Sequence, residues 1–157
     1  MLNVDLQALV ARLNQHCRSA LEGAVGLTLS RTHYNVEIEH WLSQLIEATD
    51  NDVAAILRHF EIDAGRLAAD LTKVLDRLKT GNNRSPALTP NVVKLIREAW
   101  VFGSLQWQAG AVRSGHLIVA LLADDSLAAQ ARDPSSQFAK INVETLKANF
   151  QKIVGDS

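Results

Sequence analysis

The sequence has few of the residues that stabilise secreted or β-rich domains. Among its 157 residues there are one cysteine and three prolines. The single cysteine, Cys17, cannot form an internal disulfide, which favours a reducing compartment, so we expect a cytoplasmic protein. With so few prolines, long stretches rich in Ala and Leu, both strong helix formers, are left uninterrupted. Because β-branched residues in two-residue alternation are also scarce, we predict an all-α protein and disfavour sandwiches and barrels.

Charge and hydropathy argue against further classes of protein. The chain has 16 Lys and Arg against 17 Asp and Glu, a net charge of −1, so it lacks the basic surplus of a general nucleic-acid binder. Its longest apolar runs, such as 117–123, are much shorter than the roughly 20 residues of a membrane span. The N-terminus also lacks the pattern of a signal peptide. With 47% apolar and 21% charged residues, the chain is expected to fold as one soluble domain, with neither nucleic acid nor membrane as partner.

Apolar residues recur at helical spacing along the whole chain. The first such segment predicts either one long helix or a short helix bent near Asn14 into a second. Helix N-caps are predicted at Asp63 and at Thr89, where a proline follows in the first helical position. A final helix, capped by Asn142, is predicted to continue to Val154.

The second half of the chain repeats the first. The segment HWLSQLI at 40–46 aligns with HLIVALL at 116–122, and Ile-Asp at 62–63 aligns with Ile-Asn at 141–142. Three additional residues separate these segments in the second half, and the polar stretch around Pro134 is the natural place for them. Each half alone has too small a core, so we predict that two four-helix units pack into one domain. The predicted boundaries are 13–79 for the first unit, 80–88 for a linker that begins TGNNRSP, 89–154 for the second unit and 1–157 for the domain.

Motifs that would indicate catalysis or a bound cofactor are missing. Gly110 and Gly115 have the spacing of a P-loop, but His-Leu follows in place of Lys-Ser or Lys-Thr, so no phosphate clamp is expected. The histidines show no i, i+4 pair typical of a helical zinc site. We interpret the equivalent His40 and His116 as helix-start residues whose rings form local hydrogen bonds. Cys17 falls on an apolar stripe and is expected to be a buried, inert thiol. We therefore predict no catalytic residue, no metal and no cofactor in this chain.

The leading segment, which begins Leu2 and Val4, has no counterpart in the second half. A short amphipathic helix lying beside the next helix would leave a groove that accepts the apolar face of a partner helix. The alternative is that this helix only caps the core, and spacing alone does not separate the two. The predicted groove residues are Leu6, Leu9, Val10 and Leu13 from the leading helix, Cys17, Leu21 and Val25 from the next helix, and Leu88.

The duplicated unit resembles the Clp N-terminal domain. Its shared motif reads VEIEHWLSQLI at 36–46 and VRSGHLIVALL at 112–122, and the likeness covers residues 13–154. Within that family the chain is similar to the N-domains of the ClpV unfoldases of bacterial type VI secretion, whereas other Clp proteins usually begin near the equivalent of Leu13. The segments that carry this likeness are VDLQALVARLN at 4–14, HYNVEIEHWLSQLIE at 33–47 and REAWVFGSLQWQAGAVRSGHLIVAL at 97–121.

This resemblance implies two four-helix repeats on a flexible tether in front of two AAA+ modules that bind ATP and Mg²⁺ and form a hexamer. It also implies that the N-domain, monomeric when isolated, docks an N-terminal helix of the large sheath subunit TssC, also called VipB, so that the contracted sheath can be disassembled. We therefore expect a binding domain without chemistry of its own. The alternatives are an adaptor- or degron-binding N-domain of another Clp unfoldase, or a small helical enzyme, for which the sequence has no convergent polar cluster.

Overall fold

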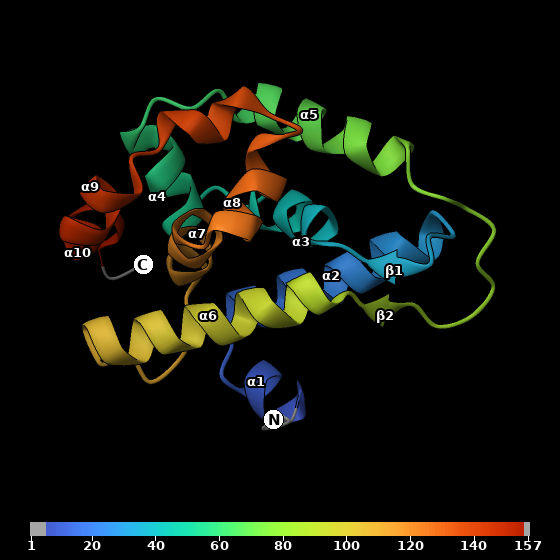
Figure 1. Cartoon of the computed structure of the whole chain (residues 1–157), viewed down its shortest axis with the longest axis horizontal. Coiled ribbons are helices and arrows are strands. Elements are labelled where there is room, and N and C mark those ends of the chain that lie inside the picture. The colour runs from blue at the N-terminus through green and yellow to red at the C-terminus, as the bar shows by residue number, and fades with distance from the viewer. Residues whose placement is uncertain (1–5, 156–157) are drawn as a thin grey trace.

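The computed structural model describes residues 6–155, and this part of the chain is almost entirely helical (Figure 1). Leu2 and Val4 lie outside the described residues. The predicted all-α fold is confirmed, and two strands of two residues each are the exception within residues 6–155. No helix of this described part is long and apolar enough to cross a membrane. The elements are α1 (Leu6–Ala11), α2 (Gln15–Ser30), β1 (Asn35–Val36), α3 (Ile38–Leu45), α4 (Asp52–His59), α5 (Ala64–Asp76), β2 (Ala87–Leu88), α6 (Pro90–Trp107), α7 (Ser114–Ala123), α8 (Asp125–Arg132), the 3-10 helix η1 (Ser136–Lys140), α9 (Val143–Ala148) and α10 (Phe150–Val154).

Local sequence signals set most of the helix starts. The side chains of Asp63 and Asn142 each accept a hydrogen bond of 3.0 Å from the backbone N–H three residues later, as predicted for N-caps. Thr89 does stand at the N-cap position before Pro90, but its side chain makes no cap hydrogen bond. Its hydroxyl instead donates to the carbonyl oxygen of Val36 at 3.2 Å, so this residue ties the start of α6 to β1.

Two helices differ from the simplest interpretation of the apolar pattern. The leading segment is bent, because α1 ends at Ala11 and Asn14 caps α2 by accepting a hydrogen bond of 2.9 Å from the N–H of Cys17. The predicted final helix is wrong as one continuous helix, because it breaks at Asn149 into α9 and α10. The side chain of Asn149 donates to the carbonyl of Thr145 at 3.1 Å and so competes with the helical backbone.

Short segments that precede two helices of the first unit pair with short segments that precede two helices of the second unit. Val36 of β1 pairs in parallel with Leu88 of β2, and an isolated parallel bridge joins Leu13 to Val112. The backbone two residues before α3 thus pairs with the backbone two residues before α6, and the backbone two residues before α2 pairs with that two residues before α7. These two pairings join α2–α5 to α6–α10 as two units of one core, and α1 is an additional helix that lies below α6 in the view of Figure 1.

The centre of the core is formed by α3 and α7. All residues from Ser114 to Leu122 of α7 are buried, and α7 packs against α4, α6, α8 and α9. In the first unit, α3 packs between α2 and α5 and contributes Trp41, which is fully buried. The indole N–H of Trp41 donates to the carbonyl of Cys17 at 3.2 Å, which gives this buried polar group a partner. In contrast, α1 lies at the edge of the domain, beside α6 (Figure 1).

Candidate functional site

A groove lies between α1 and the start of α2. It has a volume of about 430 Å³ and is lined by Leu6, Gln7, Val10 and Ala11 of α1 and by Arg18 of α2. Residues four apart share one face of a helix, so Leu6 and Val10 form one row and Gln7 and Ala11 the next. Leu6 is 38% exposed and Val10 is half-buried, so this wall of the groove presents aliphatic surface to solvent.

Tertiary contacts hold α1 in place. A six-residue helix is too short to be stable alone in water. Leu9 anchors it by pointing into the core, where it is only 4% exposed. Directly after α1, the N–H of Val112 donates to the carbonyl of Arg12 at 2.7 Å, and the N–H of Asn14 donates to the carbonyl of Val112 at 2.9 Å. The Arg12 guanidinium also lies 4.5 Å from the ring centre of Trp100 on α6. The groove therefore depends on the second unit for its position.

The structure divides the predicted groove residues into three sets. Leu6 and Val10 line the groove. Val25 and Leu88 are half-buried and pack against the core outside this groove. The other four belong to the core and do not line the groove, because the same apolar periodicity marks positions that face neighbouring helices. These core residues are Leu9, Leu13, Cys17 and Leu21.

Three residues that line the groove were not predicted from the sequence, namely Gln7, Ala11 and Arg18. Two are polar or charged and one is small, so no apolar pattern would have selected them. Arg18 is held by long contacts only: its Nη2 donates to the carbonyls of Ala11 at 3.4 Å and of Leu13 at 3.5 Å. Its Nε is buried and has no hydrogen-bond partner in the part of the chain that the structure describes. The end of α1 therefore lies against a guanidinium group that is incompletely paired.

The two histidines at equivalent positions are structural, as the sequence predicted. His40 Nδ1 accepts a hydrogen bond of 2.8 Å from the N–H of Glu37, and His116 Nδ1 accepts one of 2.9 Å from the N–H of Arg113. Burial, assisted by the nearby His33 and Arg31, lowers the pKa of His40 to about 4. The pKa of His116 is lowered to about 4, mainly by burial and to a smaller extent by the positive charge of Arg113. Both rings are therefore neutral at pH 7 and act as acceptors that cap helices.

Cys17 is an inert thiol in this fold. It is fully buried in the core. The pKa of the Cys17 thiol is raised far above its ordinary value, mainly by burial and to a smaller extent by the negative charge of Asp52. A protonated thiol is a poor nucleophile, so this residue offers no catalytic group. Within residues 6–155 there is also no cluster of three or more His, Cys, Asp or Glu side chains that could hold a metal ion.

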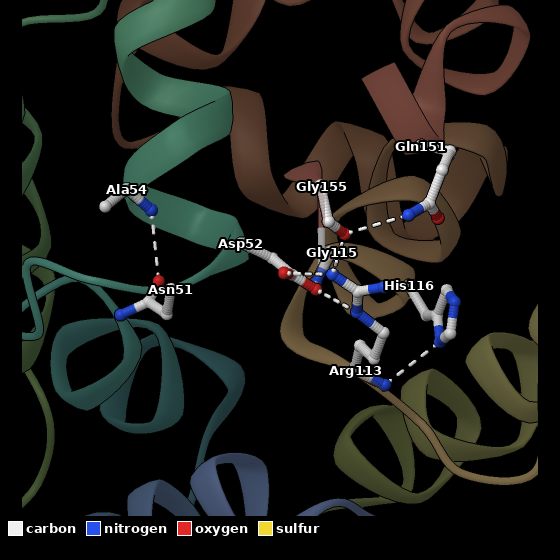
Figure 2. A network of polar contacts seen from close by, with 8 residues as sticks. All are labelled: Asn51, Asp52, Ala54, Arg113, Gly115, His116, Gln151 and Gly155. Carbon is white, nitrogen blue, oxygen red and sulfur yellow. Dashed lines mark hydrogen bonds and ion pairs between the residues drawn. The ribbon is translucent and has the colours of Figure 1, made fainter. Parts of the chain in front are cut away.

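A polar network joins the two units at a place that the sequence did not indicate (Figure 2). Asp52, at the start of α4, accepts hydrogen bonds from Arg113 Nη2 at 2.7 Å and Arg113 Nε at 2.9 Å. The same carboxylate accepts a hydrogen bond of 3.2 Å from the N–H of Gly115. Arg113 Nη2 also donates to the carbonyl of Gly155 at 2.9 Å. The network connects α4, the start of α7 and the residue after α10, so its role is to hold the two units together.

Comparison with known proteins decides the family. The sequence profile described as Clp repeat (R) N-terminal domain matches residues 12–133. The chain belongs to the Clp N-terminal domain family. This Clp N-terminal domain is 36% identical, over all of its 157 residues, to the AAA+ ATPase ClpV1 of Pseudomonas aeruginosa, and it spans 17% of the length of that relative. The resemblance to Clp domains predicted from the sequence is confirmed.

Solved structures of ClpV N-domains have the same fold as this Clp N-terminal domain. The N-domain of ClpV from Vibrio cholerae superposes with a TM-score of 0.88 at 28% identity, covering 100% of this chain and 93% of that chain. A ClpV N-domain in complex with a VipB peptide superposes with a TM-score of 0.85 at 28% identity, covering 100% of this chain and 96% of that chain. The family profile begins at residue 12, after α1, whereas these ClpV matches include α1. The similarity to ClpV therefore extends to the helix that forms the groove.

Proposed function

We propose that this Clp N-terminal domain is the substrate-recognition domain of a ClpV-type AAA+ unfoldase. Its partner is an N-terminal helix of the type VI secretion sheath subunit TssC, also called VipB, which binds in the groove between α1 and α2. The observation that carries the proposal is α1 itself: it presents Leu6 and Val10 on an open wall, and it lies before the family profile but within the ClpV matches. The solved complex of a ClpV N-domain with a VipB peptide supports the choice of partner.

The size of the groove favours a short helical ligand. Six residues of α1 extend over about 9 Å, which is close to two helical turns. A partner helix with aliphatic side chains one turn apart would place them against Leu6 and Val10. Burying apolar surface contributes about 25 cal/mol per Å², but association and the ordering of side chains offset much of this gain. One domain should therefore bind one helix only moderately.

The proposed assembly compensates for moderate affinity by avidity. In a hexamer, six domains face a sheath that contains many copies of the partner, so several contacts form at once and the combined binding is strong. We propose that ATP and Mg²⁺ act in the AAA+ modules of the whole protein, that the domain itself performs no chemistry, and that the protein is cytoplasmic. The motor would then pull on the sheath subunit held by this domain and recycle the contracted sheath.

The proposal is tested by measuring fluorescence anisotropy of labelled peptides that tile the N-terminal region of a TssC sheath subunit. We expect one helix-forming peptide to bind the domain, and we expect Leu6→Asp and Val10→Asp each to weaken its binding roughly tenfold or more. Leu29→Asp is the matched control, because Leu29 is 52% exposed near the far end of α2. Circular dichroism should show that all three variants keep their helical content.

Two results would contradict the proposed function. One is that no peptide from the sheath subunit binds the folded domain. The other is that a peptide binds but is insensitive to both Leu6→Asp and Val10→Asp, which would place the contact on a different surface. Binding of an adaptor protein with the same insensitivity would favour the alternative of a different type of Clp unfoldase.

A further inference from the structure

Arg18 is the charged residue of the groove. Among the described residues that line it, the others are Leu6, Gln7, Val10 and Ala11, which carry no charge. Arg18 lies in the first turn of α2, where the helix dipole disfavours a positive charge. Its position therefore does not stabilise α2 electrostatically, and its role must be sought in what surrounds the guanidinium group.

The guanidinium of Arg18 is incompletely paired. Its contacts of 3.4 and 3.5 Å with the carbonyls of Ala11 and Leu13 are well above the usual 2.9–3.0 Å of an N–H···O hydrogen bond. Its Nε is buried without an acceptor. None of the ion pairs found within residues 6–155 includes it. Glu22, one turn along α2, is exposed and does not pair with it.

Arg113 shows what a satisfied arginine looks like in the same molecule. Its Nε and Nη2 donate side by side to the carboxylate of Asp52 at 2.9 and 2.7 Å (Figure 2). A bidentate bond of this kind to a carboxylate is shorter and stronger than a bond to a neutral carbonyl. Arg18 has the same donors beside an apolar groove, and no carboxylate of residues 6–155 accepts from them.

We propose that Arg18 binds a carboxylate of the docked helix, so the groove selects an amphipathic helix with an Asp or Glu beside its apolar anchors. This inference rests on the proposed function of the groove. On binding, the guanidinium moves away from the two neutral carbonyls that it contacts at long distance. It forms instead a bidentate, charge-assisted pair, in which Nε leaves its buried position and gains an acceptor. The apolar wall of Leu6 and Val10 then supplies affinity, while Arg18 determines which helices are accepted and in which register.

The test is a charge exchange between the domain and the TssC peptide that binds in the tiling experiment. Each Asp or Glu of that peptide is changed singly to Lys, and binding to the unchanged domain and to Arg18→Glu is measured by fluorescence anisotropy. We expect Arg18→Glu to lower the affinity of the domain for the unchanged peptide by roughly tenfold to a hundredfold. We expect one Lys-substituted peptide to lose affinity for the unchanged domain by a similar factor and to regain most of it with Arg18→Glu.

The control for a general effect of charge is Arg77→Glu. Arg77 is exposed and follows α5, which lies across the domain from α1 (Figure 1), and the substitution changes net charge equally. We expect it to change affinity less than twofold. Recovery by the charge exchange separates recognition from collapse of the groove, because a misplaced α1 would not be restored by a lysine on the peptide. If Arg18→Glu does not fold, Arg18→Gln replaces it, and we expect that variant to lose its sensitivity to the acidic residue of the peptide.

The outcomes separate this inference from the function on which it rests. The first outcome is that the peptide binds, that Leu6→Asp lowers its affinity, and that no acidic residue of the peptide loses its effect on affinity when Arg18 is changed. That outcome refutes the role of Arg18, while the proposed function stands. A binding peptide without any Asp or Glu leads to the same conclusion. If no TssC peptide binds the unchanged domain, both proposals are overturned.

Discussion

Removal of the Asp52 carboxylate should destabilise the domain far more than removal of an exposed carboxylate. The Asp52 side chain is 4% exposed and Arg113 is 22% exposed, so their bidentate pair is largely withdrawn from solvent. Asp52→Ala would leave the Arg113 donors and the N–H of Gly115 without their acceptor. Breaking one partner of such a buried pair costs about 3–5 kcal/mol. For a domain of this size, a loss of 3 kcal/mol lowers Tm by roughly 6–12 °C.

The measurement is urea unfolding at pH 7, followed by circular dichroism, for Asp52→Ala, Arg113→Met and the double variant Asp52→Leu/Arg113→Met. The double variant should lose less free energy of unfolding than the two single variants lose together, because it leaves neither charge buried without its partner. Asp76→Ala is the control: Asp76 pairs with Arg31 at the surface, where its side chain is 58% exposed, and its loss should cost below about 1 kcal/mol. Equal costs for Asp52→Ala and Asp76→Ala would refute the reasoning, as would full additivity of the pair.

Two further predictions concern the buried histidines and the packing around Gly115. The pKa values of His40 and His116 are lowered to about 4 in the folded state, against 6.5 when unfolded. Stability should therefore be complete above pH 6.5 and fall as the pH drops towards 4, by up to about 3 kcal/mol for each ring. Urea midpoints that stay constant between pH 7 and pH 4.5 would contradict this. Gly115→Ala would place a Cβ 2.8 Å from Cζ of Phe150 and 3.1 Å from Oδ2 of Asp52. This substitution should lower the free energy of unfolding, measured in urea, by about 1–3 kcal/mol. Gly26 lies in an exposed turn of α2, where an added Cβ would meet no atom within 4 Å. Gly26→Ala should therefore stabilise the domain by about 0.5–1 kcal/mol. If both glycine substitutions changed stability in the same direction, the packing argument would be contradicted.

Features that depend on neighbours along the chain were predictable. The N-caps at Asp63 and Asn142 and the ring contacts of His40 and His116 each involve a backbone N–H three residues away. Thr89 shows the limit of this reasoning, since a partner 53 positions away takes the hydroxyl that was expected to cap α6. A pattern within the chain cannot indicate which distant carbonyl lies within reach.

The groove shows the same limit for apolar residues. Leu6 and Val10 belong to the same leading segment as Leu9 and Leu13, yet the first two line the groove and the last two are buried. The difference is tertiary: α1 turns Leu9 into the core, and the backbone that follows it is bridged to Val112 of the second unit. Arg18 was not predicted at all, because the feature that distinguishes it, a buried Nε without an acceptor among residues 6–155, leaves no mark in a sequence pattern.

The amino-acid sequence by itself determined that the chain is helical, where most helices begin and to which family it belongs. Each of these follows from local propensity, from periodicity or from a motif that occurs twice. Only the tertiary structure decided which apolar faces are covered, which charges meet across the two units and which guanidinium has a buried Nε without an acceptor among the described residues. The physical reason is that periodicity shows that a residue lies on an apolar face, whereas the burial of that face depends on which helix packs against it.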